Sequence, residues 1–589
     1  MGLSRREFMQ VMAAAAAAGL PIGARASSDD RAAGFYDMPQ FGNVRLLHFT
    51  DCHAQLLPIY FREPSINIGI GASKGKPPHL VGEHFLKYYD IKPNTRDAYA
   101  LTYLNFEQAA REYGKVGGFA HLATLVKKMR AEAPHGRSLL LDGGDTWQGS
   151  ATSLWTRGKD MVDATNHLGV DVMTGHWEFT YGEDDVIKNV KAFKGDFVAQ
   201  NVFVTDAAAF DYKYTNFSGY NANTNRAFKP YVIKNLSGIR VAVIGQAFPY
   251  TPIANPRYMF SDWTFGIQDD KMQQIVNEVR SKEKPDVVVV LSHNGMDVDL
   301  KMASRVTGVD AIFGGHTHDG VPAVVPVKNA KGSTMVMNSG SNGKFLSVLD
   351  LDVRGGKIQG FRFKLLPVFA NLLEPDHSMQ GHIDKVRAPY RKKLEEKLAV
   401  ADSVLYRRGN FNGTFDQMIC DALLDVRDAD IAFSPGFRWG TTVVPGEAIT
   451  MERLMDQTAI TYPKSTLTNM TGEEIKNIME DVADNLFNTD PYYQQGGDMV
   501  RIGGMTYAID PTKKIGHRIS DMAIRGKPIS PGRTYLVAGW ASIHPQPDSL
   551  PDIWDVVAEY LRDKKTITIN KPNTPVIKGV KGNPGLAYT

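Results

Sequence analysis

The 589-residue sequence contains little cysteine, almost no net charge and no long apolar run beyond its N-terminal segment. Only two cysteines, Cys52 and Cys420, are present, so a disulfide framework is excluded, and we expect both thiols to be buried and unpaired. A formal charge of +3 gives no support to binding of nucleic acid or of a membrane surface. The chain also lacks the roughly 20-residue apolar stretch of a membrane-spanning helix. Its length predicts two domains, because one core does not grow to this size.

The N-terminus carries signals for export. Ser4–Phe8 reads SRREF, an alanine-rich stretch follows, and Ala24-Arg25-Ala26 offers a cleavage site between small residues. We therefore expect residues 1–26 to be a Tat signal peptide and the mature protein to be periplasmic. The alternative is an ordinary alanine-rich helix. Because the Tat route carries folded proteins, a cofactor could be bound before export.

Apolar runs rich in β-branched residues alternate with helical patterns through the first two thirds of the chain. Five such runs end in polar clusters: VRLLHFTDCH (44–53), SLLLDGGD (138–145), DVMTGHWE (171–178), DVVVVLSH (286–293) and DAIFGGHTH (310–318). Helices are expected at 118–131, 270–282, 415–426 and 472–485. This alternation predicts an α/β protein, and the continuous valine run at 287–291 favours a strand buried on both faces.

Two boundaries divide the mature chain into three segments. We predict a first domain at 27–370, a charged amphipathic linker helix at 371–402, which includes YRKKLEEKL (390–398), and a second domain at 403–589. Residues 56–113 form a long segment with Gly and Pro and no clear periodicity. A loop of that length is more often functional than filler, so we expect it to gate the site or dock a partner. A family-specific elaboration without such a role is the alternative.

The polar clusters predict one metal site. Open α/β sheets build their sites at the carboxyl ends of strands, and five of the fifteen histidines fall at such ends. The candidate metal ligands are Asp51, His53, Asp145, His176, His293, His316 and His318. Imidazole and carboxylate ligands suit Mn, Zn or Fe without deciding between them.

Two short motifs each supply a pair of these ligands. In Asp51-Cys52-His53 and His316-Thr317-His318, alternate residues of an extended segment project to one side, so that each pair can address one site. Cys52 would then point away. The carboxylate of Asp145 can bridge two cations, which together would generate a hydroxide and stabilise charge in an in-line displacement.

The order DxH, GD, G-(N/H)-x-E, H, GHTH resembles the calcineurin-like metallophosphoesterases, in particular the 5′-nucleotidase family, over nearly the whole mature chain. The blocks YGKVGGFAHLATLVKKMR, LDGGDTWQGS and GTFDQMICDALLDVRDADIAFSPGFRWG are also similar. The resemblance implies a four-layer αββα sandwich joined by the linker helix to a 5′-nucleotidase-type C-terminal α/β domain. It also implies that one metal is held by Asp51, His53, Asp145 and His318, and the other by Asp145, His176, His293 and His316.

One block departs from the family, which usually reads G-N-H-E-F-D there. In Gly175–Thr180, His176 replaces a ligand Asn, Trp177 the catalytic His, and Thr180 its Asp partner. That dyad assists a poor alkoxide leaving group. A sulfur leaving group needs less help, since a free cysteine has a pKa of about 8.5. Loss of the dyad therefore favours sulfur chemistry or an inactive protein.

The second domain departs in the same direction. Ser434–Arg438 resembles the N-x-G-x-R element of the family with Arg438 retained, while Asp498 replaces the aromatic residue that stacks on a nucleobase. Together with the 56–113 insertion, these departures look like the SoxB group, the sulfate-releasing hydrolases of periplasmic sulfur oxidation. That similarity implies two Mn²⁺ ions and, as partner, the carrier SoxYZ, whose cysteine-bound S-sulfosulfanyl group is hydrolysed. The site charge of about +1 favours an anionic sulfonate.

Five residues are assigned to catalysis on this hypothesis: Asp145, His176, Arg438, Trp177 and Glu178. Asp145 bridges the metals and His176 completes the second site. Arg438 binds the anion, with a domain-interface ion pair as the alternative. Trp177 shapes a narrow, water-poor channel or simply packs, and Glu178 orients a ligand histidine or forms a buried salt bridge.

Two other functions compete with this hypothesis. One is a periplasmic 5′-nucleotidase or 2′,3′-cyclic phosphodiesterase. The other is a metal-bearing binding protein without turnover. In each case we expect a monomer that binds no nucleic acid.

Overall fold

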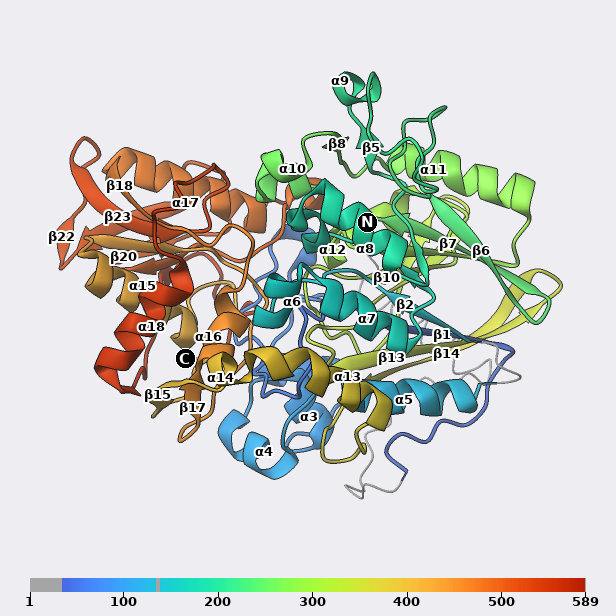
Figure 1. The fold of residues 1–589 in the computed structure, drawn as a ribbon, viewed down its shortest axis with the longest axis horizontal. Helices are drawn as coiled ribbons and strands as arrows, with labels where there is room; N and C mark the ends of the chain where they lie inside the picture. Colours follow the sequence, from blue (N-terminus) through green and yellow to red (C-terminus); the bar gives the residue numbers. More distant parts are fainter. Residues whose placement is uncertain (1–33, 134–137, 588–589) are drawn as a thin grey trace.

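A computed structural model describes residues 34–133 and 138–587 of the chain, so the expected signal peptide at 1–26 lies outside the described residues. Two α/β domains lie side by side, the first at the right of Figure 1 and the second, in orange and red, at the left. No helix of the described ranges has the length and apolarity that a membrane crossing requires. Cys52 and Cys420 are both buried and unpaired, which confirms the prediction.

Two six-stranded sheets form the first domain. The strand order of the first sheet is β14 (Lys357–Pro367), β13 (Phe345–Arg354), β1 (Val44–Phe49), β2 (Ser138–Asp142), β3 (Val172–Met173), β4 (Asp196–Phe197). The strand order of the second sheet is β11 (Val325–Asn329), β12 (Gly332–Asn338), β10 (Ala311–Gly314), β9 (Val287–Ser292), β7 (Ile239–Gln246), β6 (Tyr231–Leu236). Each of the five predicted runs therefore contains a strand. Neighbours β1, β2 and β3 are parallel, as are β7, β9 and β10, so their carboxyl ends share an edge of each sheet.

The sheets face each other and helices cover both outer faces, which confirms the four-layer sandwich. Alternate residues of β9 show why the strand is a continuous valine run: Val289 lies in the core between the sheets, and Val290 lies in the core under the outer helices. Helices α11 (Asp269–Glu278) and α12 (Met296–Arg305) cover the second sheet. The first sheet is covered by α5 (Phe119–Ala131), α7 (Lys159–Leu168), α8 (Glu183–Ala192) and α13 (His377–Arg387).

The second domain is built on the sheet β18 (Ser465–Thr471), β23 (Thr534–Trp540), β16 (Ile431–Ser434), β19 (Arg501–Gly503). Helices α15 (Thr414–Arg427), α16 (Met451–Thr458) and α18 (Ile553–Lys564) pack on one face, and α17 (Gly472–Phe487) packs on the other. Two smaller sheets complete it: β17 (Ala448–Thr450), β15 (Lys397–Ala401), β24 (Thr566–Ile567), and β22 (Lys527–Pro528), β21 (Ile519–Ile524), β20 (Met505–Ile509), β25 (Val576–Ile577).

Short elements lie between these. They are α6 (Ala151–Thr156), α9 (Asp206–Ala209), α10 (Thr251–Ala254), the strand pair β5 (Phe203–Val204) and β8 (Trp263–Thr264), a π turn at Val279–Glu283, and 3₁₀ turns at Gly71–Ser73, Trp177–Tyr181, Arg257–Phe260, Ala388–Tyr390 and Pro491–Tyr493. The four predicted helices are all present, at α5, α11 with its π turn, α15 and α17.

The linker is less helical than predicted. Helix α13 ends at Arg387, a 3₁₀ turn containing Pro389 follows, and α14 (Arg391–Leu394) adds one more turn. Residues 397–401 are then a strand of the second domain, paired with β17 and β24. Proline interrupts the helical hydrogen bonds, and the alternating KLAVA sequence favours a strand once it has partners to pair with.

The segment 56–113 is not the structureless loop that the sequence suggested. It contains α2 (Gly82–Tyr89), α3 (Arg96–Leu101) and α4 (Phe106–Tyr113), whose apolar residues form two small cores. Helices of six to eight residues span barely two turns, so their periodicity cannot be read in a sequence window of ordinary length.

The insertion also ties the two domains together. Ile66 forms a β-bridge with Leu586, and Tyr60 forms one with Thr442 of the second domain. The side chain of Asn583, which is buried, donates to the carbonyl of Gly69 at 2.8 Å. The insertion is therefore packed against the second domain and its C-terminal segment.

The hydrogen bond from Asn583 to Gly69 predicts that the substitution Asn583→Ala lowers the free energy of unfolding. The substitution leaves the buried carbonyl of Gly69 without its donor, which costs about 1–3 kcal/mol. Denaturant unfolding of the mature protein measures this change. Asn223→Ala, at an exposed position, is the matched control and is expected to change the free energy of unfolding by less than about 0.5 kcal/mol. Equal stabilities of the two variants would contradict the prediction.

Candidate dinuclear metal site

The seven predicted metal ligands come together at the carboxyl ends of the parallel strands. They lie in the loops after β1, β2, β3, β9 and β10, and all are buried. Their ligand atoms fall into two groups in which every atom lies within 4.8 Å of the others: Asp51, His53, Asp145, His318, and Asp145, His176, His293, His316. Asp145 belongs to both groups. The division is the one that the family resemblance implied.

The backbone of the ligand loops differs from the expected extended form. Asp51, His53, Asp145, His316 and His318 all have positive φ, between 45° and 73°. Left-handed conformations are uncommon outside glycine and cost of order 1–3 kcal/mol at such sites. The prediction that alternate residues of DCH and HTH project from an extended segment is therefore wrong in its geometry. The turns bring the paired side chains together instead.

In the first group, the ligand atoms of His53, His318, Asp51 and Asp145 lie close to one another. Nε2 of His53 lies 3.1 Å from Nε2 of His318, which lies 3.2 Å from Oδ1 of Asp51. The same His53 atom is 3.7 Å from Oδ2 of Asp145. Because two buried imidazole nitrogens point at each other, their lone pairs need a shared cation or a proton between them.

In the second group, the carboxylate of Asp145 is the common partner. Its Oδ2 lies 3.1 Å from Nδ1 of His176 and 2.9 Å from Nε2 of His293. The other ring nitrogen of His293, Nδ1, lies 2.6 Å from the carbonyl oxygen of Gly143. That contact holds the proton on Nδ1 and leaves the Nε2 lone pair free for a ligand role.

Burial and charge determine the protonation of these imidazoles. Burial lowers the pKa of His53 to about 3, and it also lowers the pKa of His176, His316 and His318. Burial opposes protonation of His293 as well, but the carboxylates of Asp145 and Asp51 outweigh it and raise its pKa to about 10. Neutral imidazole is the form that binds metals, and a bound cation would replace the proton of His293.

This donor set fits two divalent cations. Five imidazoles and two carboxylates supply mixed N/O ligands of the type that suits first-row transition metals. Despite burial, the imidazoles of His176 and His293 hold the pKa of Asp145 well below its usual value, whereas burial raises the pKa of Asp51. Divalent cations would compensate the charge of both carboxylates at once.

Glu178 has a different task from the two that were considered for it. Its carboxylate accepts backbone N–H groups of Asp145, Thr146, Trp147 and His176, at 2.8–3.3 Å. It forms neither a contact with a histidine ring nor a salt bridge among the interactions of the described residues. A buried carboxylate that gathers four N–H groups fixes the loop of one ligand, Asp145, against the loop of another, His176.

Trp177 and Thr180, at the positions of the dyad, are packed and carry no titratable group. The ring of Trp177 stacks on Tyr462 at 6.1 Å between centroids and meets Phe437 edge-on at 5.2 Å. Trp439 continues this wall and lies 6.0 Å from the ring of His53. The hydroxyl of Thr180 donates to the carbonyl of Trp177. Trp177 therefore joins the site to the second domain through an aromatic wall.

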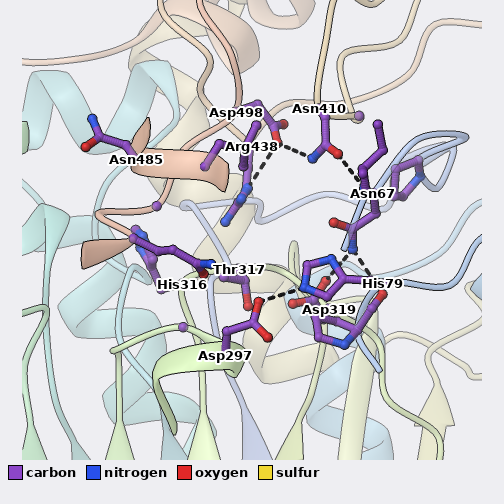
Figure 2. A pocket seen from close by; sticks show the side chains of 18 of the residues that line it. Asn67, His79, Asp297, His316, Thr317, Asp319, Asn410, Arg438, Asn485 and Asp498 are labelled. Atoms are coloured by element: carbon purple, nitrogen blue, oxygen red, sulfur yellow. Dashed lines mark hydrogen bonds and ion pairs between the residues drawn. The ribbon is translucent and has the colours of Figure 1, made fainter. Parts of the chain in front are cut away.

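A cavity opens beside His316. Figure 2 shows Arg438 reaching over it, held by Asp498, while His79 and Asp297 line the opposite side. Arg438 also donates to the carbonyl of Gly497 at 2.9 Å, and its Nη1 is buried with no hydrogen-bond partner. Its ion pair is formed within the second domain, and the guanidinium lines the cavity with one nitrogen that has no hydrogen-bond partner.

Sequence reasoning missed two further cavity residues. Arg408 is buried, its Nε has no partner, and it lies close enough to His318 to disfavour the protonated ring. His79 of the insertion pairs with Asp297 at 2.7 Å. Neither follows a strand or belongs to a spaced motif, so only the folded chain places them here.

Asp498 is held by Arg438, Arg501 and Asn410, and the two arginines keep its pKa below the usual value despite burial.

Comparison with known proteins locates two family domains. Residues 44–320 match the model of calcineurin-like phosphoesterases, and residues 397–549 match that of the 5′-nucleotidase C-terminal domain. The sulfate thiohydrolase SoxB of Thermus thermophilus, solved in complex with glycerol, is 35% identical, with a TM-score of 0.85 over 92% of this chain and 98% of that one. A 5′-nucleotidase precursor from the same organism shares the fold, with a TM-score of 0.70 at 20% identity over 91% of this chain and 99% of that one. The UshA protein of Yersinia enterocolitica is 23% identical over 72% of this chain and 80% of its own length.

The two-group geometry predicts that His176→Ala lowers metal content from two ions per chain to one. The substitution removes one of four donors from the second group and leaves the first group complete. Elemental analysis of protein purified after native export measures the change. His377→Ala, at an exposed position outside the site, is the matched control and is expected to keep both ions. Two ions per chain in His176→Ala would remove His176 from the ligand set.

Proposed function

Because this chain belongs to the calcineurin-like phosphoesterases with a 5′-nucleotidase C-terminal domain, in the branch of sulfate thiohydrolase SoxB, we propose that it is a sulfate-releasing hydrolase. Its substrate is the S-sulfosulfanyl group on a cysteine of the carrier SoxYZ, which the resemblance implies. The reaction takes place in the periplasm after export by the Tat route, and the metals are manganese.

The observation that carries this proposal is the pairing of a complete ligand set with a dyad position that holds no acid. Trp177 and Thr180 are buried among aromatic and backbone partners, so neither can protonate a leaving group. An alkoxide would need that proton. A persulfide or thiolate does not, because its conjugate acid is many orders of magnitude stronger than an alcohol.

The balanced reaction needs only water. An oxygen of water bonds to the sulfonate sulfur, the bond to the neighbouring sulfur breaks, and its electron pair leaves with the sulfur that stays on the carrier. Sulfate departs, a persulfide remains on the carrier, and the two protons of the water pass to the persulfide or to solvent. When bound, a pair of divalent cations supplies Lewis acidity toward water and the sulfonate oxygens.

The side chains of this chain divide the remaining work. The carboxylate of Asp145 holds both halves of the site together and is fixed by the N–H of Trp177 at 2.7 Å. Arg438 and Arg408 present buried guanidinium atoms without partners toward the cavity, where they orient an anionic group. The aromatic wall of Trp177, Phe437 and Trp439 excludes water from the side of His53.

Nucleotide hydrolysis is the competing function, because the curated relatives include 5′-nucleotidases and UshA proteins. Against it stands Asp498, an ionised carboxylate locked by two arginines at the place where the family stacks a nucleobase on an aromatic ring. A nucleobase at this place would have to stack on the carboxylate of Asp498, and moving that carboxylate aside would break both of its ion pairs.

The two functions separate in one assay. The manganese-loaded protein is expected to release one sulfate per sulfonated cysteine of SoxYZ and to leave AMP unhydrolysed under the same conditions. Ion chromatography of sulfate and a phosphate assay measure the products. Protein stripped of metal is the control. Turnover of AMP without sulfate release would reject the proposal, and binding of the carrier with no sulfate in a single turnover would indicate a binding protein.

Arg438→Lys tests the anion role of the guanidinium. Lysine keeps the charge near Asp498 but loses the planar, branched donor set, so the kcat/KM for sulfate release is expected to fall about 10- to 100-fold, mostly through KM. Arg354→Lys, on an exposed strand end of the first domain, is the matched control and is expected to match the unmodified protein. An unchanged KM in Arg438→Lys would restrict Arg438 to its ion pair with Asp498.

A further inference from the structure

One fully buried aromatic residue, Phe248, packs directly on two of the metal-ligand candidates. Its ring centroid lies 4.1 Å from that of His176 and 4.0 Å from that of His316, with the latter pair stacked at 29°. It meets His293, the third imidazole of the second group, edge-on at 6.4 Å. Phe248 thus contacts every histidine of the second group and is absent from the ring contacts of His53 and His318 in the described chain.

The two closest imidazoles lack the hydrogen bond that normally orients a ligand histidine. Nε2 of His176 and Nε2 of His316 are buried with no partner among the described residues, as are Nδ1 of His53 and Nδ1 of His318 in the first group. His293, in contrast, has the carbonyl of Gly143 at 2.6 Å. Metal-bound histidines usually donate their second nitrogen to an oxygen, which fixes the ring plane. Another interaction must fix the planes of His176 and His316.

The position of Phe248 is itself well determined. Its backbone N–H donates to the carbonyl of Gly175, the residue before His176, at 3.2 Å, and its carbonyl accepts the hydroxyl of Thr251 at 2.9 Å. The backbone of Gly496 lies against the Nε2 edge of the His316 ring. The approach is so close that a Cβ atom at this position would lie only 1.9 Å from that nitrogen. The ring of His316 is thereby confined between Phe248 and the Gly496 backbone.

We propose that Phe248 is a positioning residue for the second metal site: its ring sets the planes of His176 and His316 by face packing, in place of hydrogen bonds. The inference rests on the proposed metal ligands and not on the identity of the substrate.

The test is a calorimetric titration of the metal-free mature protein with Mn²⁺ alone. Phe248→Leu keeps an apolar side chain but removes the flat face, so the affinity for one of the two equivalents is expected to fall about 10- to 100-fold, the usual effect of losing an orienting neighbour. The affinity for the other equivalent is expected to stay as it is. Phe248→Tyr retains the ring and is expected to restore the lost affinity.

Phe260→Leu is the matched control, because Phe260 is also fully buried but its ring neighbour is Phe265 rather than an imidazole. It is expected to lower the melting temperature of metal-free protein as much as Phe248→Leu does while both equivalents bind normally. Two unchanged affinities in Phe248→Leu, or an equal loss at both equivalents in both leucine variants, would overturn the proposal.

A second comparison locates the effect. In the background of His176→Ala, which is expected to retain only the first site, Phe248→Leu is expected to leave the remaining affinity unchanged. A further loss there would contradict a role confined to the second site. If the unmodified protein bound fewer than two Mn²⁺ ions, the metal assignment itself would fail, which is a different outcome from a failure of the role of Phe248.

Discussion

The structure depends on burying two carboxylates and five imidazoles in one cluster at the meeting edge of two sheets. Burial strips these groups of water, and together with the neighbouring Asp145 carboxylate it raises the pKa of Asp51. The two carboxylates in turn raise the pKa of His293 to about 10. The cluster therefore needs a positive charge, which is the proton of His293 in the chain alone and would be supplied by bound cations instead. The left-handed ligand loops carry a further cost in backbone strain, which the binding of cations would have to offset.

The second domain completes this cluster instead of merely lying beside it. Gly496 touches His316, Trp439 lies beside His53, and Arg438 faces the cavity. The insertion fastens that domain in place through Ile66 and Leu586. Any motion that separates the domains must break these contacts and expose the aromatic wall, so the arrangement of arginines over the metal ligands is part of the resting fold.

Strand patterns and ligand types were readable in the sequence because both repeat. A continuous run of valines marks β9 as a strand buried on both faces, and five polar clusters follow five strands, so the ligand positions could be named before the fold was known. Glu178 could be named as a site residue, but its task could not be read, because it binds backbone N–H groups, which leave no trace in residue type. The short helices of the insertion and the strand at 397–401 form only because tertiary partners override weak local preferences.

The cavity is lined by charges of both signs that are paired with one another. Arg408 and Arg438 lie close to the metal-ligand candidates His318 and His316. Of the two carboxylates in the lining, Asp297 is held by His79, and Asp319 lies near Arg408. An anionic group is therefore favoured where the arginines line the cavity. A nucleotide, which carries its base and ribose beyond the phosphate, would have to place an aromatic ring against the Asp498 carboxylate that both arginine pairs hold in place.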